Sequence, residues 1–190
     1  MNMMLVNQLF IDTFKNNKIS KQLKKPLDKL KYLINDTKDI LIDTDGNPFD
    51  LYFDHKCLLC GSSGKLKHSN YGNHINKYKT IVRFNIAPTE GYEKFVGDRT
   101  TIRFIRGPTL RRKILPVKKN RKYLNDSDYI IIVGRFKKFK SKSKVLFINP
   151  KFLERLNLIF KASTGFVGFL IMHMLSDKLD LIGFMNLGYV

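Results

Sequence analysis

The fold is indicated first by residues 57–64, CLLCGSSG, in which a short apolar run ends in a glycine-rich turn. A continuous apolar run is typical of a strand that is buried on both faces of a parallel sheet. The turn that follows leaves backbone N–H groups and the hydroxyls of Ser62 and Ser63 free to meet an anion. This stretch therefore predicts a buried strand with a candidate anion site at its end.

A second predicted strand, residues 81–85, ends in the polar residue Asn85. Ligands of open α/β sheets bind at the ends of the strands, so Asn85 is a candidate ligand-binding residue. The alternative is an asparagine that only closes a turn before Pro88. The motif alone leaves both interpretations open.

A third candidate site lies at the start of an apolar helix that we predict over residues 166–175. Ser163, Thr164 and Gly165 come directly before it, so a hydroxyl N-cap and a helix N-terminus are presented together. The free N–H groups and the dipole of a helix N-terminus favour a bound anion. The sequence thus predicts a second anion-binding turn.

Strands are also predicted over residues 129–133, 144–148 and 179–184, and we expect the last of these to be buried. A short helix is predicted over residues 151–160. Strands alternate with helices along the chain, which indicates the α/β class with a mainly parallel sheet flanked by helices.

The N-terminal region predicts helices and a turn. Residues 1–41 have apolar side chains at helical spacing and predict two helices, within an N-terminal helical segment of residues 1–50. Asp43 and Asp45 then match the Asp-x-Asp metal motif of many nucleotide-sugar glycosyltransferases. An Asp-Gly turn explains the same residues, and turn chemistry favours that interpretation.

The length and composition predict one soluble domain of residues 1–190. Hydrophobic residues make up 43% of the chain, and no apolar run approaches the roughly 20 residues that a membrane span needs. We find neither a secretory signal nor a membrane anchor.

The net charge is +19, and residues 106–144 alone carry 14 basic and 2 acidic residues. Such a stretch is compatible with a nucleic-acid-binding face. The simpler interpretation is a solvated, partly disordered insertion, because charge alone does not identify a partner.

The two cysteines, Cys57 and Cys60, cannot complete a zinc tetrahedron by themselves. On a strand their side chains point to opposite faces, which also argues against a mutual disulfide. We predict two buried thiols.

Taken in order, these motifs resemble the animal-type sialyltransferases, whose donor is CMP-sialic acid and whose sequences share a large and a small sialyl motif. Residues 57–104 match the large motif and residues 162–184 the small one. The residues that carry the resemblance in the large motif are Cys57, 61–64, Tyr71, Gly72, 81–85, 87–89, 91–93, Val96, Gly97 and 100–104. Those in the small motif are 163–165, Asp177, Leu179, Leu181, Gly183 and Phe184.

The resemblance implies a variant GT-A fold with a Rossmann-like sheet that binds CMP-sialic acid without a metal and transfers sialic acid to a glycan acceptor, for example a galactose-terminated one. Ser62, Ser63 and Asn85 would lie near the nucleotide and its phosphate. Ser163, Thr164 and Gly165 would lie at the phosphate and the cytidine. The domain then divides into the large-motif region, the basic region 106–144 and the small-motif region 145–190.

Three departures from the family pattern matter. The family usually has asparagine at Ser62, and a hydroxyl offers one donor where an amide offers two. The family's large-motif cysteine pairs with a small-motif cysteine, but that position here is Ser176. The family implies the Golgi lumen, whereas the lack of this disulfide and of a signal or anchor leaves the cytoplasm open.

The third departure concerns catalysis. The family's catalytic histidines follow the small motif, and none of the four histidines of this chain, His55, His68, His74 and His173, matches their positions. We expect no catalytic residue here, and we expect His173 to be a core histidine. The alternatives are a truncated enzyme, an enzyme whose missing part lies on another chain, a donor-binding pseudoenzyme, or a basic nucleic-acid-binding protein on a decayed glycosyltransferase scaffold.

Overall fold

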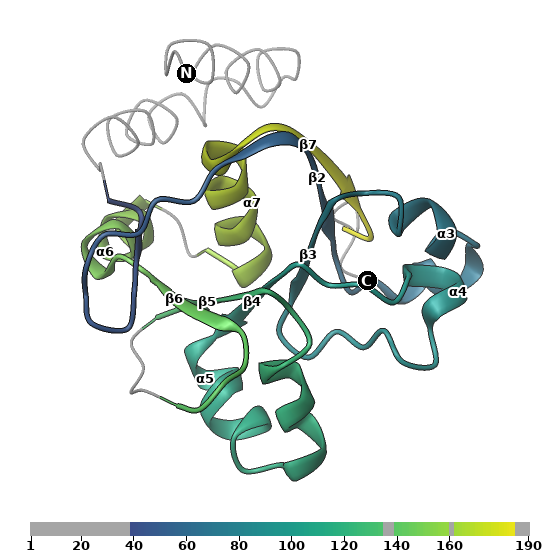
Figure 1. The fold of residues 1–190 in the computed structure, drawn as a ribbon, viewed down its shortest axis with the longest axis horizontal. Helices are drawn as coiled ribbons and strands as arrows, with labels where there is room; N and C mark the ends of the chain where they lie inside the picture. The colour runs from purple at the N-terminus through teal and green to yellow at the C-terminus, as the bar shows by residue number, and fades with distance from the viewer. Residues whose placement is uncertain (1–38, 135–138, 160–161, 185–190) are drawn as a thin grey trace.

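The computed structural model describes residues 39–134, 139–159 and 162–184. These residues form one seven-stranded sheet with helices on both faces (Figure 1). The strands are β1 (Leu41–Ile42), β2 (Phe53–Cys60), β3 (Thr80–Phe84), β4 (Ile102–Arg106), β5 (Tyr129–Val133), β6 (Lys144–Ile148) and β7 (Ser176–Ile182). The helical elements are η1 (Gly64–His68), α3 (Gly72–Ile75), α4 (Glu93–Val96), α5 (Gly107–Thr109), η2 (Leu110–Ile114), η3 (Lys118–Leu124), α6 (Pro150–Ile159) and α7 (Thr164–Leu175).

The strand order is β1-β6-β5-β4-β3-β2-β7, and every pairing except that of β1 with β6 is parallel. This confirms the predicted α/β class with a mainly parallel sheet. Because the strands β2 to β7 run the same way, their carboxyl ends meet at one edge of the sheet. Helix α7 leads directly into β7 and runs back across the sheet, so its N-terminus also lies at that edge.

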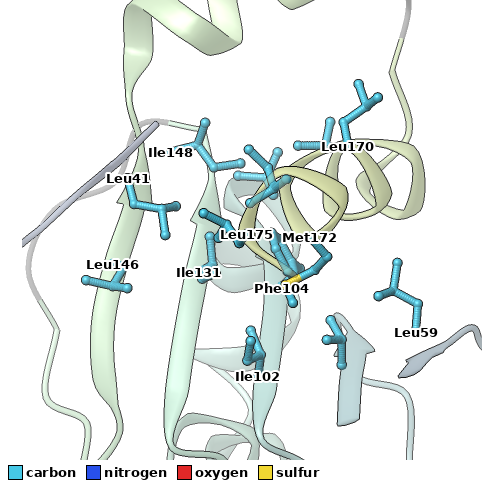
Figure 2. Packing of buried hydrophobic residues seen from close by; sticks show 14 of the residues in the cluster. Leu41, Leu59, Ile102, Phe104, Ile131, Leu146, Ile148, Leu170, Met172 and Leu175 are labelled. Atoms are coloured by element: carbon cyan, nitrogen blue, oxygen red, sulfur yellow. The ribbon is translucent and has the colours of Figure 1, made fainter. Parts of the chain in front are cut away.

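One face of the sheet packs against α6 and α7 (Figure 1). The apolar core between them contains Phe104, Ile131 and Leu146 from the strands and Leu170 and Met172 from α7 (Figure 2). Both helices were predicted from the sequence, and both are present with boundaries close to the predicted ones. This packing positions the N-terminus of α7 at the carboxyl edge of the sheet.

The other face carries η1, α3 and α4 at one end and the elements of residues 107–124 at the other. Leu110, Ile114 and Leu124 are buried there against the β5 residues Ile130 and Ile132. The interpretation of residues 106–144 as a partly disordered insertion is therefore wrong for the described residues 106–134 and 139–144. Apolar residues spaced between the charged ones are buried on one side of these helical turns, and the high charge of the segment made this pattern easy to overlook.

The strands at residues 129–133 and 144–148 have the boundaries that were predicted, and the strand at residues 81–85 is shifted by one residue. The expectation of a buried strand at residues 179–184 is wrong. Strand β7 is longer, begins at Ser176, and lies at the edge of the sheet beside β2, with Leu181 52% exposed. An apolar edge strand has the same composition as a central one, so the sequence alone does not separate the two.

Residues 1–38 of the predicted N-terminal helical segment lie outside the described residues. Its described part, residues 39–50, contains the short strand β1 followed by a turn, so the helical prediction is wrong there. In the described ranges we find no helix that is long and apolar enough to cross a membrane.

Candidate functional site

The glycine-rich turn after β2 is fixed to the end of β7 by backbone hydrogen bonds. Gly61 donates its N–H to the Ile182 carbonyl at 2.8 Å, and Ser63 donates to the Gly183 carbonyl at 3.2 Å. A Cβ on Gly61 would collide with the Gly183 carbonyl group, so only glycine permits this approach. The tip of the turn, Ser62, is exposed and makes no hydrogen bond with any described residue. Its hydroxyl and N–H are therefore open to a ligand.

Ser63, in contrast, has a structural partner. Its side chain caps η1 by accepting a hydrogen bond from the Lys65 N–H at 3.3 Å. Ser63 therefore supports the shape of the turn, and its hydroxyl hydrogen is still able to donate to a ligand.

Asn85 follows β3 in a left-handed conformation, with φ at 51°. Its side-chain oxygen accepts the Arg106 N–H at 3.0 Å, and its backbone carbonyl accepts from the Arg103 guanidinium at 2.9 Å. No described residue accepts from its side-chain Nδ2. Asn85 therefore presents N–H donors, which are the groups that bind an anion.

The third turn begins α7 as predicted. The Ser163 hydroxyl is the N-cap and accepts the Phe166 N–H at 3.1 Å. Thr164 is only 7% exposed, so its side chain belongs mostly to the interior. The surface of this turn is formed mainly by Ser163 and Gly165.

Phe184 connects the three turns. Its ring packs edge-on against Phe84, at 5.7 Å between centroids, and a Cβ on Gly165 would lie 3.2 Å from it. Phe84 directly precedes Asn85, and Gly183 holds the Ser63 N–H. The six predicted site residues thus lie around one edge of the sheet, at the ends of β2 and β3 and at the start of α7, and the end of β7 connects them.

A pocket of about 290 Å³ opens beside the glycine-rich turn. Ser62 and Ser63 line it, but Asn85 and residues 163–165 do not. The remaining lining residues were not among the predicted site residues, although two of them belong to the predicted glycine-rich turn. These residues are Gly61, Gly64, Leu66, Lys67, Arg83, Ala87, Pro88, Tyr92, Phe95 and Val96.

Two cations give this pocket a positive character. Arg83 is 1% exposed and donates to the Cys60 sulfur at 3.2 Å, to the Arg99 carbonyl at 3.1 Å and to the Val96 carbonyl. Its hydrogen bonds reach no carboxylate among the described residues, and burial lowers the pKa of its guanidinium. Lys67 lies over the Tyr92 ring at 5.1 Å. A buried cation beside an open pocket favours a ligand with negative charge.

The cysteines and Ser176 lie as the sequence analysis expected. Cys57 and Cys60 are free and buried, and they contribute to clusters on opposite faces of the sheet. Burial raises the pKa of both thiols, and a hydrogen bond with the Ser176 side chain acts in the opposite direction on Cys57. Ser176 is thus a direct neighbour of Cys57.

The structure favours the turn interpretation of the Asp-x-Asp motif. One carboxylate oxygen of Asp43 accepts the N–H groups of Asp45 and Asn47, at 2.8 and 3.0 Å. These hydrogen bonds lower the pKa of the Asp43 carboxyl. In the part of the chain that the structure describes, no three His, Cys, Asp or Glu side chains cluster closely enough to hold a metal ion.

Each of the four histidines lies on a different element of the fold. His55 contacts the hydroxyl of Thr80 at 2.9 Å, near the amino ends of β2 and β3 and so at the edge opposite the candidate site. His74 packs against Tyr78, and His173 stacks on Phe169 within α7. His68 ends η1. None of the four lines the pocket.

The aromatic and basic residues 135–138, part of the candidate nucleic-acid-binding stretch, lie outside the described residues. The described segment 107–124 has seven exposed basic residues and no acidic one. They are Arg111, Arg112, Lys113, Lys118, Lys119, Arg121 and Lys122.

The fold is that of the mammalian sialyltransferases. A crystal structure of a mammalian sialyltransferase in complex with Gal-beta-1-3GalNAc-ortho-nitrophenol matches 96% of this chain and 71% of that chain, with a TM-score of 0.53 and 21% identity. A second crystal structure of a mammalian sialyltransferase matches 84% of this chain and 64% of that one, with a TM-score of 0.51 and 22% identity.

The model of glycosyltransferase family 29 (sialyltransferase) matches residues 5–140. The chain therefore belongs to glycosyltransferase family 29, the sialyltransferases. This range includes the large-motif region 57–104 but not the small-motif region 162–184.

Two relatives illustrate the extent of the similarity. A CMP-N-acetylneuraminate-beta-galactosamide-alpha-2,3-sialyltransferase 1 from Sus scrofa is 29% identical over 157 residues, which cover 68% of this chain and 43% of the pig protein. A CMP-N-acetylneuraminate-beta-galactosamide-alpha-2,3-sialyltransferase 4 from Rattus norvegicus is 48% identical over 48 residues, which cover 25% of this chain and 14% of the rat protein. The chain spans less than half the length of the curated relatives that it matches.

Proposed function

We propose that this chain binds CMP-sialic acid at the carboxyl edge of its sheet, as the donor-binding part of a sialyltransferase. The observation that carries the proposal is the convergence of three turns through residues 183–184. Gly183 holds the turn after β2, and Phe184 packs on Phe84 and Gly165. Three segments that are distant in sequence thus present hydrogen-bond donors at one place.

The chemistry of these turns suits the donor. CMP-sialic acid carries a phosphate and a carboxylate, both of which accept hydrogen bonds from N–H and O–H groups. Ser62 and the Asn85 Nδ2 offer such donors without losing a protein partner. The Arg83 and Lys67 side chains, which line the pocket, favour the donor's negative charge. Donor recognition of this kind needs no metal.

The acceptor is proposed to be a glycan with a terminal galactose. This rests on the relatives, whose names specify beta-galactosides or beta-galactosamides as acceptors. Transfer needs a base for the acceptor hydroxyl, and no described histidine lines the pocket. We therefore assign donor binding to the described residues and leave catalysis to groups outside them.

Isothermal titration calorimetry with CMP, CMP-sialic acid and UDP tests the proposal. CMP and CMP-sialic acid should bind, with EDTA present, and UDP should bind more weakly. The substitutions Asn85→Ala and Thr164→Ala should each weaken CMP binding by about 1–3 kcal/mol, as expected when a charged or buried polar group loses a partner. Equal binding of all three nucleotides, or unchanged CMP binding in both variants, contradicts the proposal.

A second candidate function is nucleic-acid binding through residues 107–124, whose exposed charges are all basic. Binding of a single-stranded oligonucleotide through these side chains should weaken steeply with added salt, since neutralised phosphates release counterions. Donor binding should depend chiefly on the cytidine and much less on salt. Absence of oligonucleotide binding at low salt removes this candidate.

A further inference from the structure

The shape of the Asn85 turn is unusual for its residue type. Its φ of 51° is the only positive value among the non-glycine residues that the structure describes. Asparagine reaches this region more easily than most residues, but the conformation still needs support from its surroundings. Contacts with the surrounding structure are therefore needed to keep Asn85 in this backbone conformation.

Hydrogen bonds occupy both acceptors of Asn85. The Arg106 N–H donates to its side-chain Oδ1 at 3.0 Å, which leaves Nδ2 directed away as a donor. Its backbone N–H donates to the Phe104 carbonyl at 2.7 Å, and its own carbonyl accepts from the Arg103 Nη1 at 2.9 Å. These hydrogen bonds fix the orientation of the Asn85 side-chain amide, so that its Nδ2, and not its Oδ1, is open to a ligand.

Arg103 is the centre of this arrangement. It is 0% exposed, and its Nη1 also contacts the Ala87 carbonyl at 3.3 Å, on the other side of the turn. Its Nε and Nη2 donate to the two carboxylate oxygens of Asp126, at 2.9 and 2.6 Å. The ring of Tyr123 stacks on the guanidinium at 4.9 Å.

We propose that the Arg103–Asp126 ion pair is a brace that holds Asn85 in its donor-binding conformation, so that both residues are positioning residues for the nucleotide. The inference rests on the proposed function for its ligand. It also goes beyond it, because Asp126 belongs to the connection between η3 and β5 and does not line the pocket. The inference thus assigns an effect on nucleotide affinity to Asp126, which does not contact the nucleotide.

The physical reason lies in the geometry of the guanidinium. A bidentate carboxylate fixes the plane of the Arg103 fork, and the remaining Nη1 is then aimed between the carbonyls of Asn85 and Ala87. Without the carboxylate, the guanidinium is a buried cation with no acid partner. It must turn or draw in water, and the Asn85 carbonyl loses its support.

The substitution Asp126→Asn tests the brace. The Asp126 side chain is 28% exposed, so an amide of the same shape should be accommodated without unfolding. CMP affinity should fall about tenfold, the effect expected when one hydrogen bond to a charged group is lost. Asp126→Glu, which keeps the carboxylate, should recover part of the affinity.

A double-mutant cycle separates positioning from a general loss of stability. If Asp126 acts through Asn85, the variant with both Asn85→Ala and Asp126→Asn should bind CMP no more weakly than Asn85→Ala alone. The matched control is Glu90→Gln, which removes a neighbouring exposed ion pair with Lys122. This control should leave CMP affinity unchanged.

NMR of the protein without nucleotide provides a readout that does not depend on CMP. Couplings that report the sign of φ at Asn85 should change in Asp126→Asn and stay as in the wild type in Glu90→Gln. Unchanged couplings, or additive losses in the cycle, overturn the inference. Failure of the wild-type protein to bind CMP would instead remove the proposed function, while the couplings would still decide whether the brace exists.

Discussion

Gly61 lies so close to Gly183 that no other residue fits at its position. A Cβ on Gly61 would meet the carbonyl group of Gly183, which belongs to the backbone and cannot rotate away. The backbone angles of Gly61 do not themselves require glycine, so the contact alone decides the outcome. The end of β7 and the turn after β2 therefore depend on each other for their shape.

The substitution Gly61→Ala should separate these two segments. We expect a loss of about 1–3 kcal/mol in the free energy of unfolding, typical of overpacking, together with loss of CMP binding. The matched control for stability is Gly64→Ala, three residues later, where a Cβ meets open space. Because Gly64 lines the pocket, this control is read by melting alone. Thermal melting and calorimetry measure both effects. A Gly61→Ala variant with the melting temperature of the wild type would show that the two segments move apart at little cost.

Ser62 offers a gain-of-function test. It occupies the position at which the family usually has asparagine, and it makes no hydrogen bond with the described residues. Ser62→Asn replaces one O–H donor with two N–H donors and removes no existing contact, so CMP affinity should rise by about 0.5–1.5 kcal/mol. Ser62→Ala should lower it. Weaker CMP binding in Ser62→Asn than in the wild type would indicate that the turn does not face the nucleotide.

Ser176 allows the family's disulfide to be restored. The Ser176 side chain is buried, donates to the Met172 carbonyl at 2.7 Å and lies beside the Cys57 thiol. Ser176→Cys should form a disulfide with Cys57 under oxidising conditions and raise the melting temperature. Closing so long a loop typically contributes about 2–4 kcal/mol.

A thiol count checks this prediction, because one free thiol, that of Cys60, should remain in the oxidised variant. The control is Ser176→Cys combined with Cys57→Ser, which should show no redox-dependent melting. Two titratable thiols left after oxidation, beyond that of Cys60, would mean that the two side chains do not meet.

The sequence predicted the parts of this structure that follow from local patterns. The run at residues 129–133 forms β5 because a continuous stretch rich in β-branched residues suits a strand that is buried on both faces of a parallel sheet. Ser163 became the N-cap of α7 because its hydroxyl satisfies a free N–H group. Strand order is a different matter, and β7 was expected in the interior because composition does not encode which strand is outermost.

Contacts between distant residues could not be predicted in the same way. Arg103 and Asp126 are 23 positions apart, and on sequence both belong to ordinary charged segments. Only the fold buries the arginine beside Asn85. The packing of residues 107–124 was likewise not predicted, because buried residues such as Leu110 and Ile114 are outnumbered there by charged and polar ones. The candidate site residues could be proposed from the sequence because turns at strand ends have local signatures, whereas Lys67, Arg83 and Tyr92 line the pocket beside them without such a signature.

The pair formed by Tyr78 and Asp180 predicts a pH dependence. Their hydrogen bond raises the pKa of Tyr78 to about 12 and lowers the pKa of Asp180. A raised pKa in the folded state means that the contribution of Tyr78 to stability is complete below its usual pKa of 10.0 and is lost as the pH rises toward about 12. The contribution of Asp180 is present above its usual 3.8 and is lost as the pH falls through its lowered value.

Tyr78→Phe should therefore melt at a lower temperature than the wild type at about pH 8, and the difference should shrink above pH 10 as Tyr78 ionises. Absorbance at 295 nm should show one late-titrating tyrosine fewer in this variant. Tyr71→Phe is the control, because the Tyr71 side chain is exposed and should leave melting unchanged. A constant difference between Tyr78→Phe and the wild type across this range would contradict the assignment.

The last prediction concerns turnover by the polypeptide of these 190 residues. Sialyl transfer needs a base for the acceptor hydroxyl, and loss of a positioned base typically lowers the rate by about 10²- to 10⁴-fold. His173, the one histidine on α7, lies nine residues beyond Thr164, which is about 14 Å along the helix from the candidate donor site. It stacks on Phe169 within the same helix. We therefore expect CMP binding with little transfer when CMP-sialic acid is supplied together with galactose-terminated acceptors, with a mammalian sialyltransferase as the positive control. Rapid transfer would require a base in this polypeptide, and His173→Ala would then test the histidine on α7: a variant that keeps CMP affinity but loses transfer would assign that role to His173.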